Sequence, residues 1–130
     1  MRLIIAGGRD YELTPEDFAK LDRIHADKRV SKVLSGRATG VDTCGEEWAR
    51  MNGIPVDPYP APWDEIDGKP HWQIGYRTDG VSYWKLAGHA RNERMAENAD
   101  GVALFLGGHG TANMKKNADK FGLVIFDFRT

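Results

Sequence analysis

Three glycine-rich stretches hold the residues of this sequence that are best suited to chemistry. Each follows a short apolar run and combines glycines with hydroxyl, arginine or acidic side chains. Their residues are Gly7, Gly8 and Arg9; Ser35, Gly36, Arg37, Thr39, Gly40 and Asp42; and Gly107, Gly108, His109, Gly110 and Thr111. Glycine has no Cβ, so successive backbone N–H groups can converge on an anion. These stretches therefore predict a site for a phosphate-like group.

Tight strand-to-helix turns also need glycine, and one such loop alone would favour that explanation. Two of the loops run directly into predicted helix N-termini, whose unpaired N–H groups and positive dipole end attract phosphate. Ser35, Thr39 and Thr111 add hydroxyl donors, and Arg9 or Arg37 can supply positive charge. The occurrence of two such loops at adjacent strand ends favours the anion site.

The elements that position these loops alternate between apolar runs and helical patterns. Strands are predicted at residues 2–7, 32–36, 54–60, 101–107 and 123–128, and helices at 14–27, 40–53, about 90–98 and 111–121. This alternation predicts one domain over residues 1–130, a Rossmann-like three-layer α/β sandwich. Its mainly parallel five-stranded sheet is expected in the order 3-2-1-4-5. Ligands bind such sheets beyond the carboxyl ends of the strands, where the order reverses, here between strands one and four.

Two local signals are specific. Thr14 is a predicted N-cap, with Pro15 at the first helical position and Asp17 closing a capping box. Residues 64–88 interrupt the alternation with four aromatic side chains around Asp79-Gly80, which predicts an inserted hairpin. We expect its aromatic side chains to pack against the domain or a second subunit, with a lid over the site as the alternative.

Composition limits the function classes. The chain has 130 residues and a formal net charge of −1, which argues against nucleic-acid binding because such proteins carry a basic surplus. The single cysteine excludes an internal disulfide, and the apolar N-terminal run is too short to span a membrane, so we expect a cytoplasmic protein. His25, His71 and His89 have no partners at metal-ligand spacing, so we expect no metal and no cofactor.

Four segments resemble the YspA/YpsA-related branch of the SLOG superfamily. They are MRLIIAGGRDY, VLSGRATGVDTCGEEWAR, ARNERMAENAD and LFLGGHGTANM. The superfamily has Rossmann-like domains and includes the Smf/DprA proteins and the LOG-type phosphoribohydrolases. The resemblance implies a pocket for a nucleotide or a nucleotide-derived ligand.

The LOG-type enzymes have an arginine-containing helix followed by the pattern P-G-G-x-G-T-x-x-E. The resemblance places their active-site arginine on Arg91 and their glutamate on Met114, and Leu106 replaces their proline. It therefore implies that the cradle is kept and that the catalytic carboxylate is not. A catalytic residue is not identified, although Asp42, Glu93 or His109 can substitute in principle.

Four residues have a structural and a functional interpretation. Arg91 either binds a phosphate bidentately or is a solvated helix residue, and we favour the phosphate. Asp42 either complements the helix dipole or binds ligand hydroxyls such as those of ribose, and we favour the second. Asn92 either reads the edge of a base or caps its helix. His109 is an acid–base or phosphate contact, or points to solvent.

The function that we predict is binding of a nucleotide-type small molecule by a sensor, carrier or sequestering protein, as a homodimer without membrane attachment. The alternative is an N-glycoside or phosphoribosyl hydrolase acting on a nucleotide. A second alternative is single-stranded nucleic-acid binding, as in the DprA relatives, against which the net charge argues.

Overall fold

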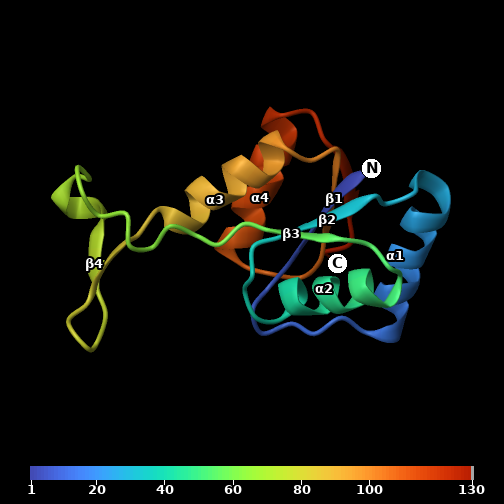
Figure 1. The fold of residues 1–130 in the computed structure, drawn as a ribbon, viewed down its shortest axis with the longest axis horizontal. Coiled ribbons are helices and arrows are strands. Elements are labelled where there is room, and N and C mark those ends of the chain that lie inside the picture. The colour runs from blue at the N-terminus through green and yellow to red at the C-terminus, as the bar shows by residue number, and fades with distance from the viewer. Residues whose placement is uncertain (130) are drawn as a thin grey trace.

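The computed structural model describes residues 1–129. Its main sheet has five strands in the order β3-β2-β1-β6-β7 (Figure 1). The strands are β1 (Arg2–Ala6), β2 (Lys32–Ser35), β3 (Val56–Pro58), β6 (Gly101–Leu104) and β7 (Val124–Asp127). All neighbouring strands pair in parallel. Once the two hairpin strands are set aside, this is the predicted order 3-2-1-4-5, which is thereby confirmed.

Four helices cover the two faces of the sheet. They are α1 (Pro15–Lys28), α2 (Val41–Met51), α3 (Ala87–Glu97) and α4 (His109–Lys120). Leu3 and Ile5 of β1 pack in one core cluster with residues of α1 and α2. Ile4 and Ala6 pack in a second cluster with residues of α3 and α4. Because side chains alternate between the faces of a strand, a continuous apolar run supplies both cores. The predicted three-layer sandwich is confirmed (Figure 1).

The start of α1 follows its sequence signals. Thr14 is the N-cap, its hydroxyl accepts from the Asp17 amide, and the Asp17 carboxylate accepts from the Thr14 amide at 3.0 Å. Both halves of the predicted capping box are therefore present.

Most element boundaries differ from the prediction by one to three residues, and those of α3, α4 and β3 have a physical reason. Helix α3 begins at Ala87 rather than near Ala90, and α4 begins at His109 rather than at Thr111. Neither N-cap makes a side-chain hydrogen bond, so the sequence had no capping residue to mark either start. Strand β3 is limited to Val56–Pro58 because the flanking prolines interrupt the ladder. The α4 correction matters for the site, since His109 and Gly110 lie in the first helical turn.

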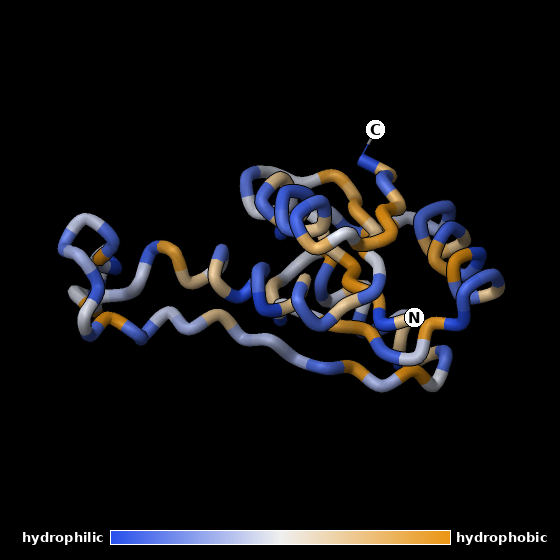
Figure 2. Tube along the Cα trace, turned by 90° about the horizontal axis from the view of Figure 1, so that it is seen from above, coloured by the Kyte–Doolittle hydropathy of each residue, from blue (hydrophilic) through white to orange (hydrophobic). Residues whose placement is uncertain are grey.

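The predicted hairpin is present in what we call the arm, residues 60–86. Strands β4 (Ile74–Tyr76) and β5 (Ser82–Trp84) pair antiparallel, after a 3₁₀ turn, η1 (His71–Gln73). The arm extends away from the sheet and its helices in both views (Figures 1 and 2).

Most arm aromatics pack within the arm or face solvent. The Trp84 indole N–H donates to Gln73 Oε1 at 3.0 Å, while Trp72 and Tyr76 are 69% and 66% exposed. The hairpin therefore does not use these two side chains to seat itself on the domain. Packing against a second subunit stays a prediction.

Candidate functional site

A cavity of about 330 Å³ lies at the carboxyl end of β1, where the strand order reverses between β1 and β6. Ten of the sixteen predicted site residues line it: Gly7, Gly8, Arg9, Gly36, Asp42, Arg91, Asn92, Gly108, Gly110 and Thr111. The other six, Ser35, Arg37, Thr39, Gly40, Gly107 and His109, lie outside its lining. The topology thus brings residues of three separate loops and three helices to one hollow.

The apolar part of the cavity wall belongs to the core between the sheet and helices α3 and α4. Ile4, Ala6, Met95 and Met114 contribute to it. Met114 is only 2% exposed, so the position that the LOG resemblance assigns to a glutamate is a buried thioether in this cavity. A thioether cannot transfer a proton or stabilise an oxocarbenium-like centre as a carboxylate does.

Arg91 of α3 crosses to the loop after β2. Its Nη1 donates to the Gly36 carbonyl at 2.6 Å, and its Nε donates to Asn92 Oδ1 at 3.0 Å. Burial lowers the pKa of the Arg91 guanidinium, and the nearby charge of Asp42 opposes this effect. These bonds fix the guanidinium at the cavity wall. In residues 1–129 no acceptor pairs with its Nη2, which leaves that nitrogen for a ligand.

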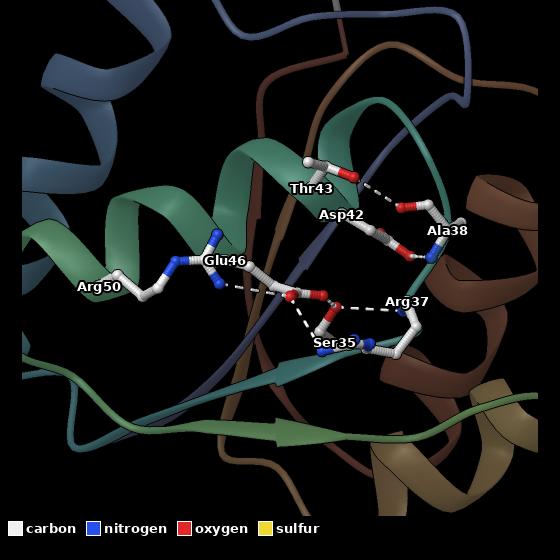
Figure 3. A network of polar contacts seen from close by, with 7 residues as sticks. All are labelled: Ser35, Arg37, Ala38, Asp42, Thr43, Glu46 and Arg50. Carbon is white, nitrogen blue, oxygen red and sulfur yellow. Dashed lines mark hydrogen bonds and ion pairs between the residues drawn. The ribbon is translucent and has the colours of Figure 1, made fainter.

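Asp42 faces the same region from the first turn of α2. Its Oδ2 accepts from the Ala38 amide at 3.1 Å (Figure 3). Burial raises the pKa of the Asp42 carboxyl to about 6, although the Ala38 amide and the Arg91 charge both lower it. A Cβ on Gly36 would lie 2.6 Å from Arg91 Nη1 and 3.0 Å from Asp42 Oδ2. Glycine at position 36 therefore allows both charged groups to approach the loop.

Asn92 connects the two helices beside the cavity. Its Nδ2 donates to the Gly110 carbonyl at 3.2 Å and to Asn113 Oδ1 at 3.1 Å. The side chain is buried, and its oxygen accepts from Arg91. Asn92 therefore does not cap its own helix; it joins the Arg91 guanidinium to the first turn of α4.

The first turn of α4 is the open part of the predicted cradle. Within residues 1–129, the amides of His109, Gly110 and Thr111 have no protein acceptor. Four free N–H groups and a partial positive charge are normal at a helix N-terminus, and both favour an anion. A Cβ on Gly107 would overlap Thr111 Oγ1, so glycine is needed for the close turn before the helix. His109 is exposed and outside the cavity lining, which matches the alternative in which it points to solvent.

The first turn of α2 and the loop before it are partly occupied by protein acceptors. The Val41 amide donates to the Gly8 carbonyl at 3.2 Å, and the Ala38 amide donates to Asp42. The Gly8 amide in turn donates to the Leu106 carbonyl at 2.7 Å. These bonds hold the three loops together. Within residues 1–129, the first turn of α4 leaves three amides without a protein acceptor, and that of α2 leaves two, those of Asp42 and Thr43.

Ser35 and Arg37 are held by a carboxylate that the sequence did not reveal as a site residue. The Ser35 hydroxyl donates to Glu46 Oε2 at 2.6 Å, and Arg37 Nη1 donates to Glu46 Oε1 at 3.2 Å (Figure 3). Arg50 Nη1 lies 3.7 Å from the same Oε1. Ser35 and Glu46 are both buried, so this network anchors the loop after β2 to α2. The only sequence signal was that Glu46 follows Asp42 by one helical turn.

Thr39 and Gly40 shape the same loop. The Thr39 hydroxyl donates to the Arg9 carbonyl at 3.4 Å. Gly40 has φ of 73°, and a Cβ there would overlap the carbonyl oxygens of Gly8 and Arg9. These contacts give both residues a structural role in joining the first two loops.

Two general properties complete the description. Within residues 1–129, no three His, Cys, Asp or Glu side chains come together as a metal site would need. None of the helices in that range combines the length and apolar character needed to cross a bilayer.

Fold and cavity together define a Rossmann-like α/β protein with a candidate ligand site at the reversal of strand order. A profile of YAcAr, the YspA, cpYpsA-related SLOG family, matches residues 1–65, half of the chain. The chain therefore belongs to this SLOG family, whose members often bind nucleotide-related ligands. The family resemblance predicted from the sequence is confirmed. Arg91, Met114 and α4 lie outside the matched segment, so their LOG correspondence stays a prediction.

One solved structure shares the fold. The X-ray structure of DNA processing protein A (DprA) from Streptococcus pneumoniae aligns with a TM-score of 0.66 and 17% sequence identity. The alignment covers 97% of this chain and 49% of that one, so this chain spans about half the length of the DprA structure. At this identity the likeness shows the fold alone. A comparison with curated proteins gives no match.

Proposed function

We propose that this protein binds a nucleotide or a nucleotide-derived phosphate ligand in the cavity beyond β1. The observation that carries the proposal is that one hollow is lined by Arg91 and by Gly110 and Thr111 of α4, whose amides have no protein acceptor within residues 1–129. An arginine can hold phosphate oxygens with charge-assisted hydrogen bonds, and a helix N-terminus adds backbone donors. Membership of the SLOG family supports a nucleotide-related ligand.

The site suits a protein that binds its ligand without converting it, as a sensor, carrier or sequestering protein does. The position that the LOG resemblance assigns to the catalytic glutamate holds Met114, which offers no proton-transfer group. About four charge-assisted hydrogen bonds of up to ~3 kcal/mol each exceed an association cost of roughly 4 kcal/mol, the lower limit, by enough to give micromolar affinity. Such a site needs no catalyst.

A thermal-shift screen tests the proposal. AMP, ADP, cyclic AMP, ADP-ribose and ribose 5-phosphate are added separately to the purified protein. A ligand at about 100 times its dissociation constant should raise the free energy of unfolding by about 2.7 kcal/mol. We expect Arg91→Ala to abolish this gain. Arg94→Ala is the matched control, since Arg94 lies on the same helix, is exposed and does not line the cavity.

The alternative function is hydrolysis of a nucleotide N-glycosidic bond, and Asp42 is the observation that favours it. A carboxyl whose pKa is about 6 can exchange protons near neutral pH, as a general acid or base must. Release of free base from AMP, measured by chromatography, would establish this activity. Its loss in Asp42→Asn would assign the proton transfer to that residue.

Single-stranded nucleic-acid binding remains a second alternative because the similar fold belongs to a DNA processing protein. The net charge of −1 argues against it. Failure to retard labelled single-stranded DNA at low salt would remove it. The predicted homodimer is tested by light scattering on the eluting peak of a gel-filtration column.

A further inference from the structure

A second hollow of about 250 Å³ adjoins the cavity. Its lining residues are Arg9, Gly36, Arg37, Ala38, Thr39, Trp63 and Arg91. Arg9, Gly36, Ala38 and Arg91 also line the first cavity, so the two hollows share one wall. A ligand held by Arg91 can therefore extend from one hollow into the other.

Trp63 at the base of the arm is the aromatic side chain of this second hollow. A Cβ on Gly88 would lie 3.6 Å from Trp63 Cη2 and 3.9 Å from Arg91 Nη2. The indole thus lies over the first turn of α3, beside the guanidinium. Tyr83 contacts the indole edge to face, with ring centroids 6.2 Å apart and an interplanar angle of 70°. The Trp84 amide donates to the Trp63 carbonyl at 2.6 Å. The hairpin therefore positions Trp63 at the site.

The charge of this hollow suits an anion joined to a flat ring. Its lining contains three arginines and no Asp or Glu. Arg37 is paired with Glu46, whereas Arg9 forms no ion pair within residues 1–129. Arg9 and Arg91 thus supply positive charge next to the indole. Aromatic side chains and arginines together are the groups on which nucleobases stack.

We propose that Trp63 forms a base-stacking subsite, so that the ligand is a free nucleotide with its phosphate at Arg91 and α4 and its base on the indole. This inference rests on the proposed function and names the part of the ligand that the second hollow takes. The arm thus contributes to the site through Trp63, close to where it joins the domain. Trp72 and Tyr76, which are exposed, do not line the second hollow.

Calorimetric titration with AMP and with ribose 5-phosphate separates the base from the rest of the ligand. Stacking on one aromatic ring should make AMP bind about five- to 100-fold more tightly than ribose 5-phosphate. Trp63→Ala should lose this difference and keep ribose 5-phosphate binding. Trp63→Phe should keep part of it. Trp72→Ala, in the same arm but 69% exposed, should behave as wild type.

If Trp63→Ala does not fold, tryptophan fluorescence of the wild-type protein and of Trp63→Phe still tests the subsite. AMP should quench tryptophan fluorescence in the wild-type protein, and Trp63→Phe should bind AMP without that quenching. Equal affinity of wild type and Trp63→Ala for AMP, or quenching retained in Trp63→Phe, would overturn the subsite and leave the proposed function standing. Absence of AMP binding would also overturn the subsite, whereas absence of a response to all five compounds of the thermal-shift screen would refute the proposed function. A short single-stranded DNA that competes better than AMP would overturn the assignment to a free nucleotide.

Discussion

Replacing Asp42 by asparagine should stabilise the protein at neutral pH and have little effect in acid. The pKa of the Asp42 carboxyl rises from 3.8 to about 6 because burial disfavours its charged form. Below pH 3.8, the pKa of this carboxyl in the unfolded chain, Asp42 is protonated in both the folded and the unfolded state. Between about 4 and 6 the folded state holds a proton that the unfolded chain has lost, so stability falls as pH rises. Above about 6 the loss is complete.

The size of this loss of stability follows from the shift in the pKa of Asp42. One pKa unit corresponds to 1.36 kcal/mol, so the ionised carboxylate costs up to ~3 kcal/mol. Asparagine cannot ionise, and its side-chain oxygen can still accept from the Ala38 amide. The attraction between Arg91 and the Asp42 carboxylate is already included in this cost, because it is one of the effects that lower the pKa. We therefore expect Asp42→Asn to raise the free energy of unfolding by roughly 2–3 kcal/mol near pH 7.5 and by close to zero near pH 4.

Urea unfolding followed by circular dichroism at both pH values measures this difference. Asp10→Asn is the matched control, because Asp10 is an exposed carboxylate in the loop after β1 and pays no burial cost. A gain from Asp42→Asn that is equal at the two pH values would show that ionisation is not its cause. A loss that grows with pH would show that the Asp42 charge stabilises the fold, and would refute the reasoning.

Three further substitutions test other parts of the site. Ser35→Ala should lower the free energy of unfolding by ~1.5–3 kcal/mol, because a buried carboxylate of Glu46 loses its donor, and should leave AMP affinity unchanged in titration calorimetry. Gly40→Ala should cost more than ~2 kcal/mol in urea unfolding, whereas Gly53→Ala should cost ~1 kcal/mol, because both have positive φ but only the first Cβ meets backbone. Met114→Glu should lower the free energy of unfolding by ~2–4 kcal/mol, measured by thermal denaturation, because the position is buried. Met114→Leu, its control, should cost less than ~1.5 kcal/mol.

Each of these outcomes can contradict the structure. Loss of AMP binding in a folded Ser35→Ala variant would show that the Ser35 hydroxyl contacts the ligand. Equal costs at the two glycines would mean that the loops after β1 and β2 are not in contact. A Met114→Glu variant as stable as wild type would place this side chain in water.

The strands and helices were predictable because each apolar run, glycine turn and helix pattern is a local property of consecutive residues. The same holds for the capping box of Thr14 and Asp17, whose partners are three residues apart. The order of the strands followed from their alternation with helices and from the general rules for parallel sheets. Starts of α3 and α4 were missed because Leu86 and Gly108 offer no side-chain cap to detect. The start of a helix could thus be predicted where a capping side chain marks it, and not where the cap is absent.

Side-chain partners were beyond the sequence. The sequence predicted both Ser35 and Asp42 as ligand contacts, and only packing showed that the Ser35 hydroxyl donates to Glu46 while Asp42 lines the cavity. Trp63 was overlooked because its neighbours, Gly88 and Arg91, are distant in the chain.

The sequence by itself therefore determined the α/β alternation, the family and the glycine loops that meet at one end of the sheet. The tertiary structure alone decided which donors remain unpaired there. Arg91 meets the carbonyl of Gly36 only because α3 packs beside the loop after β2, 55 residues earlier in the chain. A hydrogen-bonding group is available to a ligand only when no neighbour has already paired with it, and those neighbours are set by how the helices pack on the sheet.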